Sequence, residues 1–203
     1  MEREKQKYNE MNTSFCLFKK KHLPIIESFK TYNDDLREFL FEDALRSREH
    51  SVSTTFLIFD KNKSGKSILG YITILNDATR LDADLKEKFR EKGYNYKSIP
   101  ALKIGRLCID DRYRNMGVGK TAVAFAIKRA VFLNLMSSCR FINVDAKRHP
   151  DKEKDSFHFY KKLGFEVLKE RKGIDPWRQT SGITPMYLDL YHIIHLTREK
   201  HHF

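Results

Sequence analysis

The chain has 203 residues, of which 39 are Lys or Arg and 27 are Asp or Glu, so its formal net charge is +12. A chain of this length can bury a substantial core, and we expect a single domain spanning residues 1–203. The positive charge favours polyanionic partners such as RNA, DNA or an acidic protein.

Three cysteines without metal-ligand spacing argue against a zinc site or a disulfide framework. The chain starts with charged residues and has no apolar run near the ~20 residues of a membrane span, so we expect a cytoplasmic protein without membrane attachment.

The first elements follow a polar N-terminus. Residues 1–12 are almost wholly polar, and we expect a frayed or helical extension to which no function is assigned. Asn33 or Asp34 is a good N-cap for the helix that follows. The helix is expected at residues 34–47. Two strands that form a hairpin are expected next, at residues 52–60 and 68–75.

An insertion is expected at residues 79–98, between the hairpin and the central strand. Leu81, Leu85 and Phe89 have helical spacing, and Gly93 marks a helix end.

Two groups of basic residues could contact a polyanion. Tyr94 and Tyr96 alternate with Lys92 and Lys97, a mixture suited to stacking on bases beside phosphates. The alternative is that the tyrosines pack a short helix onto the domain. The cluster Lys19–Lys21 could also contact a polyanion, and its alternative is an ordinary solvated face, which is what a run of charge usually forms.

Residues 104–128 have the pattern of a strand, a glycine-containing turn and a helix. Ile104, Leu107 and Ile109 are strand formers, and an acidic pair ends the run. Apolar residues then recur at helical spacing, so a helix is expected to begin near Gly119.

The turn between this strand and helix has the chemistry of an anion site. Gly117 and Gly119 allow close approach to the backbone, and the N–H groups of the first helical turn have no intrahelical partner. Arg112, Arg114 and Lys120 add positive charge, which the helix dipole reinforces. The alternative is an ordinary strand-to-helix turn. A dinucleotide fingerprint would need an acidic residue about 20 positions further on, and a Walker loop would need glycine in place of arginine at 114; neither is present.

The last third continues the alternation of strands and helices. A helix that contains Tyr160 is expected to end at Gly164. A loop at residues 171–185, rich in glycine and proline, can shape a substrate pocket. The remaining strands are expected at residues 140–146, 165–169 and 186–191.

Two motifs together resemble the GNAT superfamily of N-acetyltransferases. Arg114, Gly117 and Gly119 match the R/Q-x-x-G-x-G/A signature, and the run SFHFYKKLGF that ends at Phe165 resembles the late family helix ending in F-Y-x-x-x-G-F. One helix and one strand separate the motifs, as in the family. The resemblance implies an α/β (α+β) fold, with a central mixed, mostly antiparallel sheet flanked by helices. It also implies transfer of acetyl from acetyl-CoA to a primary amine.

The resemblance further implies the residues of the site. The turn would hold the pyrophosphate of acetyl-CoA, and a backbone N–H near Leu107 or Cys108 would stabilise the developing oxyanion. Tyr160 would donate its proton to the departing CoA thiolate, whereas the alternative is an aromatic side chain packed beneath the cofactor. The implied acetyl-CoA-binding residues are Leu107, Cys108, Ile109, Arg114, Asn115, Met116, Gly117, Val118, Gly119, Lys120 and Thr121.

The sequence departs from the family pattern in two places. The central strand contains no glutamate to act as base, so either water relays the proton or the amine arrives deprotonated. His149 and His158 are candidate bases by residue type, and the alternative is that each is a surface or packing histidine. Glu153 and Ser156 replace the family's frequent Asn and Ala upstream of the tyrosine.

One branch of the superfamily, the GNAT toxins that acetylate aminoacyl-tRNA, shares several further stretches with this chain. These are NDDLREFLFEDAL, GYITIL, IPALKIGRLCID and NVDA. An α-amine has a pKa near 8, which an ester neighbour lowers, so such an acceptor needs little help from a base. The resemblance therefore implies tRNA, an antitoxin and a second copy of the chain as partners. The candidate phosphate contacts are Lys19–Lys21, Lys86, Lys92, Lys97, Lys147 and Arg148.

Two alternatives remain open. The first is a generic acetyltransferase that acts on protein lysines, a small amine or a polyamine. The second, from another class, is a nucleic-acid-binding module that has lost acetyl transfer, although the intact Tyr160 and turn argue against it.

Overall fold

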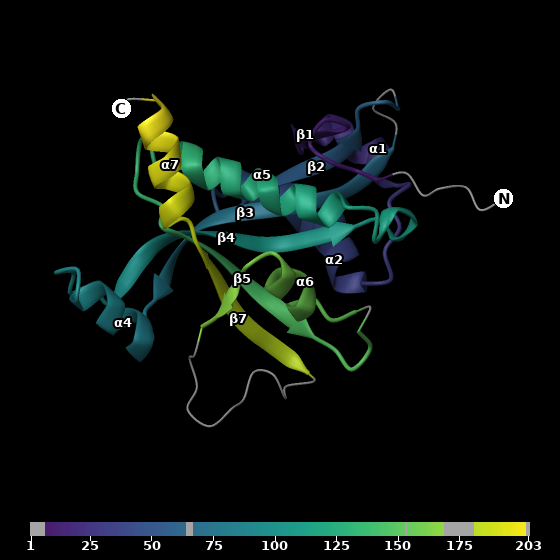
Figure 1. Ribbon diagram of the computed structural model, residues 1–203. Helices are drawn as coiled ribbons and strands as arrows, with labels where there is room; N and C mark the ends of the chain where they lie inside the picture. Colours follow the sequence, from purple (N-terminus) through teal and green to yellow (C-terminus); the bar gives the residue numbers. More distant parts are fainter. Residues whose placement is uncertain (1–6, 64–66, 153, 169–180, 202–203) are drawn as a thin grey trace. The chain divides into compact units, whose positions relative to one another are not determined.

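The computed structural model describes residues 7–63, 67–152, 154–168 and 181–201 (Figure 1). The strands are β1 Thr13–Leu17, β2 Thr54–Asp60, β3 Ile68–Arg80, β4 Ser98–Ile109, β5 Phe141–Arg148, β6 Glu166–Val167 and β7 Gly182–Asp189. The α-helices are α1 Leu23–Ile26, α2 Asp34–Glu38, α3 Ala44–Glu49, α4 Ala83–Arg90, α5 Val118–Leu133, α6 Phe157–Lys162 and α7 Tyr191–His201. The short elements are the 3₁₀ turns η1 Lys20–His22 and η3 Asp111–Tyr113, and the π-helical turn η2 Phe39–Asp43.

The strands follow the order β1-β2-β3-β4-β5-β7-β6. The pairs β1·β2, β2·β3, β5·β7 and β6·β7 are antiparallel, and Val144 of β5 lies opposite Met186 of β7. The sheet is mixed and mostly antiparallel and is accompanied by helices, which confirms the predicted fold class.

The chain divides into two compact units, which are described separately. The first comprises residues 1–75 and 104–126, and the second comprises residues 76–103 and 127–203. β3, β4 and α5 each contribute residues to both units.

The core of the first unit packs β2 and β3 against the N-terminal helices. Tyr71 of β3 lies at its centre and donates a hydrogen bond to the carbonyl of Leu36 at 2.6 Å. The helix predicted after Asn33 is present, because the Asn33 side chain accepts from the Leu36 N–H at 3.1 Å. A π-helical turn interrupts this helix, a feature that its apolar spacing does not reveal. The buried core residues include Phe18, Ile26, Phe29, Leu40, Leu57 and Ile68.

The core of the second unit contains the helix predicted within the insertion. The Asp82 side chain caps α4 by accepting from the Leu85 N–H at 2.9 Å. Gly93 ends the following turn with a φ of +82°, as its sequence position predicts. Leu85 packs with buried residues of β4, β5 and β7, namely Ile99, Ala101, Phe141 and Tyr187.

A guanidinium group joins several segments of the second unit. Arg140 forms a bidentate ion pair with Asp189, with Nε–Oδ1 and Nη2–Oδ2 distances of 2.7 and 2.8 Å. The same group lies over the rings of Tyr191, Phe89 and Phe141, at 4.4, 5.4 and 5.8 Å from their centroids. The start of β5 is thereby connected to α4 and to the start of α7.

Several boundaries differ from the sequence predictions, and one helix was not predicted. β3 continues to Arg80, into the predicted insertion. β7 spans residues 182–189 rather than 186–191, because it pairs with β5 along the whole length of both strands. The carboxylate of Asp189 then accepts from the Tyr191 N–H at 2.8 Å, so the chain turns there into the unpredicted helix α7.

The described part of the N-terminal extension also differs from its prediction. Residues 7–12 are neither helical nor frayed: they form a turn before β1, and Tyr8 is buried with 5% of its surface exposed. The stretch is almost wholly polar, and a single tyrosine gives no periodic signal that predicts its burial.

Candidate active site

The predicted strand, turn and helix are present in the first unit. Leu107, Cys108 and Ile109 end β4, and α5 begins at Val118, one residue before the predicted start. The turn between them contains two left-handed residues, Asn115 with φ +61° and Gly117 with φ +92°. The structure therefore brings all eleven predicted acetyl-CoA-binding residues together on one strand–turn–helix segment.

The start of α5 presents a row of backbone donors. The Thr121 N–H and hydroxyl both lie 3.2 Å from the Gly117 carbonyl oxygen, which closes the first intrahelical hydrogen bond. The four amides from Gly117 to Lys120 precede this bond and have no intrahelical acceptor. With the dipole of a helix that spans residues 118–133, they form a site suited to phosphate oxygens.

A buried carboxylate fixes the end of β4 where the turn begins. Asp110 is fully buried and accepts from the Lys30 N–H at 2.9 Å, and from the N–H, Nε and Nη2 of Arg112 at 3.0, 2.8 and 2.7 Å. Burial alone would raise the pKa of this carboxyl, but the hydrogen bonds from Arg112 and Lys30 outweigh it and lower the pKa. Arg112 also donates to the Ser28 carbonyl at 2.9 Å. The loop at residues 28–30 is thus tied to the base of the turn.

The signature arginine is held by its neighbours. The Arg114 guanidinium lies 4.7 Å from the centroid of the Tyr32 ring, and its Nη1 lies 3.9 Å from Oδ1 of Asp111. Burial raises the pKa of Tyr32, and the charge of Arg114 partly opposes the shift. Tyr32 and Asp110 are site residues that sequence reasoning missed, because no local motif shows that the segment after α1 meets this turn.

Two of the three cysteines, Cys108 and Cys139, are buried. Burial raises the pKa of Cys108 to about 12 and that of Cys139 to about 11, so neither forms a thiolate at neutral pH. The thiol of Cys108 lies 3.4 Å from the Thr31 hydroxyl, within the core of the first unit.

Tyr160 lies in the second unit, on α6. It has 7% of its surface exposed, and its ring packs at 5.0 and 5.2 Å from the rings of Phe159 and Phe165. Burial raises the pKa of its phenol, which therefore remains protonated at neutral pH. Gly164, with φ +89°, ends this helix as predicted.

A polar network crosses the strands of the second unit. The Asn143 side chain donates to Asp77 at 2.9 Å and accepts from the Thr79 hydroxyl at 2.7 Å. Lys103 and Asp145 form an ion pair at 2.6 Å. The alternation of Asn143 and Asp145 in β5 is a period-2 signal that could have placed both on one face of the strand.

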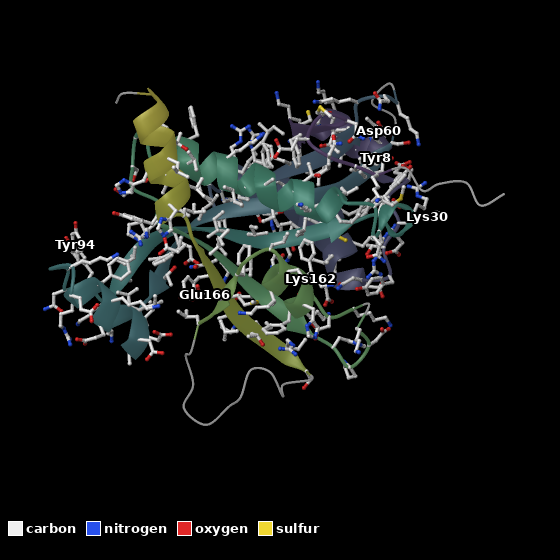
Figure 2. All side chains as sticks on the ribbon, in the orientation of Figure 1. Tyr8, Lys30, Asp60, Tyr94, Lys162 and Glu166 are labelled. Atoms are coloured by element: carbon white, nitrogen blue, oxygen red, sulfur yellow. The ribbon has the colours of Figure 1, made fainter. Side chains whose placement is uncertain are left out.

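The candidate polyanion contacts have different outcomes. Tyr94 and Tyr96 stack on each other with ring centroids 6.3 Å apart, and 53% and 61% of their surfaces are exposed, so they are not packed into the core. Tyr94 is labelled in Figure 2. Arg148 was wrongly predicted as a phosphate contact, because it is buried in an ion pair with Asp155 at 3.0 Å. Burial would raise the pKa of Asp155, but hydrogen bonds from the His149 N–H, Arg148 and the Phe157 N–H lower it.

Other predictions concern absences or lie outside the described residues. The described parts of the chain contain no group of three or more His, Cys, Asp or Glu side chains placed to hold a metal ion. Of the helices in the described segments, none has the length and apolar character that a membrane span needs. Most of the predicted pocket loop at 171–185, and Glu153, lie outside the described residues.

The chain belongs to the acetyltransferase (GNAT) family, whose model matches residues 21–165. It is therefore an acetyltransferase, and acetyl-CoA is its acetyl donor. No curated protein sequence matches the chain.

Several solved structures share the fold. AtaT complexed with acetyl-methionyl-tRNAfMet is 22% identical, with a TM-score of 0.70 over 92% of this chain and 99% of that one. A tyrosine-to-phenylalanine mutant of KacT is 18% identical, with a TM-score of 0.71 over 91% and 99%. A mutant AtaT toxin bound to the C-terminus of the antitoxin AtaR and acetyl-CoA is 18% identical, with a TM-score of 0.65 over 92% and 98%. At these identities the likeness is one of fold.

Proposed function

We propose that the protein transfers the acetyl group of acetyl-CoA to the α-amino group of aminoacyl-tRNA. The observation that carries the acetyl-CoA site is the row of amides from Gly117 to Lys120 at the start of α5. The acceptor is supported by the likeness to AtaT, whose structure holds acetyl-methionyl-tRNA, and by the net charge of +12.

The residues of the turn would bind the pyrophosphate. The Gly117–Lys120 amides donate hydrogen bonds, while Arg114 and Lys120 contribute positive charge. Arg114 is oriented for this by Tyr32 and Asp111. The backbone of Leu107, Cys108 and Ile109 would bind the pantetheine arm, and an N–H near Leu107 or Cys108 would stabilise the developing oxyanion.

Tyr160 is proposed to be the general acid. Acetyl-CoA supplies an activated acetyl group, and the CoA thiolate that departs when this group is transferred needs a proton. Burial raises the pKa of the Tyr160 phenol, so the phenol is protonated throughout the neutral range; the same shift makes it a weaker acid, so it gives up its proton only as negative charge develops on the departing sulfur. The acceptor nitrogen must be uncharged to attack, and an α-amine with a pKa near 8 is partly uncharged at neutral pH. No protein base is therefore needed to deprotonate the amine before attack, and the proton that the nitrogen loses after attack passes to water.

The biological setting follows from the same proposal. The chain would act as a toxin on cytoplasmic aminoacyl-tRNA, would be held inactive by an antitoxin and would form a homodimer. The structure of AtaT bound to the antitoxin AtaR supports the antitoxin. Sedimentation of the purified protein measures the homodimer directly.

The acceptor is tested by measuring the release of free CoA from acetyl-CoA. Charged tRNA should support turnover, whereas uncharged tRNA should not. Turnover on lysine peptides or polyamines alone would refute the tRNA acceptor and favour a generic acetyltransferase. The absence of turnover with every acceptor would favour a binding module.

The catalytic role is tested with Tyr160→Phe. Removing a general acid should lower kcat by roughly 10²–10⁴-fold, while the acetyl-CoA Kd stays close to that of the wild type. Tyr187→Phe is a matched control, because Tyr187 is also a buried tyrosine of the second unit and donates to Glu166 at 2.7 Å. If both variants lose turnover equally, the loss is structural and Tyr160 is not the acid.

A further inference from the structure

The N-terminal segment contacts the phosphate turn inside the first unit. The Tyr8 N–H donates a hydrogen bond to the carbonyl of Met116 at 2.7 Å. Met116 precedes Gly117, whose amide opens the row of donors. A residue from the start of the chain thus holds the backbone of the turn directly.

The side chain of Tyr8 is itself anchored. Its hydroxyl donates to Oδ2 of Asp60 at 3.2 Å, and Figure 2 shows the two side chains close together. Its ring meets the Tyr113 ring edge-on, with centroids 6.0 Å apart. Burial and the charge of Asp60 raise the pKa of Tyr8 to about 12, so the hydroxyl stays protonated and remains a donor at neutral pH. Asp60 is also buried and lies at the end of β2, so the anchor is part of the core.

The turn is shaped to accept this contact. A Cβ at position 117 would lie 2.5 Å from the Tyr8 carbonyl oxygen, and Gly117 has a φ of +92°. The glycine therefore satisfies two requirements: a left-handed conformation and close approach to the N-terminal segment. Asn115 is also left-handed, so the turn contains two residues in a backbone region that is sparsely populated. Such conformations persist when the surrounding structure holds them.

We propose that Tyr8 is a positioning residue for acetyl-CoA, holding the turn at residues 114–121 in its anion-binding conformation. A flexible turn would have to become ordered when the pyrophosphate binds, and that ordering weakens binding. A turn already fixed by the Tyr8 N–H and its anchor on Asp60 avoids this loss. The inference rests on the acetyl-CoA site proposed above and is independent of the acceptor.

The first test compares Tyr8→Phe and Tyr8→Ala with the wild type in calorimetric titrations of the full chain with acetyl-CoA. Tyr8→Phe removes the bond to Asp60 and keeps the ring, so the Kd should rise roughly twofold to tenfold, the equivalent of one net hydrogen bond. Tyr8→Ala removes the ring as well and should raise the Kd further. In steady-state kinetics the KM for acetyl-CoA should rise, while kcat at saturating acetyl-CoA is unchanged.

Tyr187→Phe separates positioning from stability. Like Tyr8→Phe, it removes a tyrosine–carboxylate hydrogen bond, but in the second unit. It should therefore lower the melting temperature about as much as Tyr8→Phe does, without changing the Kd for acetyl-CoA. An unchanged Kd in both Tyr8 variants, or an equal rise in the Tyr187 variant, would overturn the inference. If the wild type itself fails to bind acetyl-CoA, the proposed site fails and the inference with it, which is a distinguishable result.

A second test uses the coupling between Tyr8 and Gly117. Gly117→Ala should weaken acetyl-CoA binding, because the methyl group meets the fixed carbonyl of Tyr8. In the Tyr8→Ala background the N-terminal segment can move aside, so the additional loss from Gly117→Ala should be smaller. Losses that simply multiply would contradict a direct contact between the segment and the turn.

Discussion

The carboxylate of Asp110 offers a quantitative test of how the base of the turn is held. Asp110→Asn keeps the volume of the side chain but replaces one acceptor oxygen with a donor that faces N–H groups. The carboxylate is fully buried and accepts from Lys30 and Arg112, and the Arg112 side chain is 45% exposed. Breaking a fully buried pair costs about 3–5 kcal/mol, and the exposure of Arg112 places this change near the lower end. We therefore expect about 3 kcal/mol lower stability at pH 7.

The pH dependence of stability provides a second readout of the same variant. The hydrogen bonds lower the pKa of Asp110 in the folded protein below its unfolded value, near 3.9. The stability that Asp110 contributes is thus complete above the unfolded pKa and is lost as the pH falls through the folded pKa. Between about pH 5 and pH 3 the wild type should lose more stability than Asp110→Asn.

Urea unfolding followed by circular dichroism measures both effects. Asp111→Asn is the matched control, because Asp111 is partly exposed and lies 3.9 Å from Arg114, so its loss should cost less than about 1 kcal/mol. Equal stability of the Asp110 and Asp111 variants at pH 7 would refute the reasoning. So would parallel loss of stability on acidification in the wild type and in Asp110→Asn.

Three further predictions follow from burial, close packing and charge. Iodoacetamide should modify Cys16, which is half-buried, before Cys108 or Cys139, whose burial raises their pKa; mass spectrometry of early time points checks this, and early labelling of Cys108 would contradict it. Gly70→Ala should destabilise the protein by roughly 1–3 kcal/mol, because its Cβ would lie 2.5 Å from the Cys108 carbonyl oxygen; an unchanged melting temperature would show that the strands can separate without cost. If tRNA is the acceptor, its affinity should fall steeply with salt, and Lys97→Ala should reduce the slope of log K against log salt by about 0.7–0.9 if that lysine contacts one phosphate; a slope equal to that of the wild type would exclude the contact.

Local features of the site were predictable from the sequence. The strand that ends at Ile109, the glycine turn and the helix α5 have strong local signals, because apolar periodicity and glycine positions act within a few residues. The helix bearing Tyr160 and its end at Gly164 were predictable for the same reason.

The long-range contacts of the site were not predictable. Tyr8 reaches Met116, and Lys30 reaches Asp110, across separations that a single sequence does not reveal. The prediction that Arg148 contacts phosphate was wrong for a related reason. Its guanidinium forms an ion pair with Asp155 inside the second unit, and residue type alone does not distinguish a buried arginine from a solvated one.

The guanidinium of Arg140 has a consequence for local opening of the second unit. Because it contacts Asp189, Phe89 and Tyr191 at once, the end of β7, the helix α4 and the first turn of α7 share one partner. If one of these segments loses its contact with Arg140, the guanidinium is less well fixed against the other two. Amide hydrogen exchange in α4 and in the first turn of α7 should therefore accelerate together in Arg140→Lys. Two segments separated by about a hundred residues would then behave as one cooperative unit of exchange.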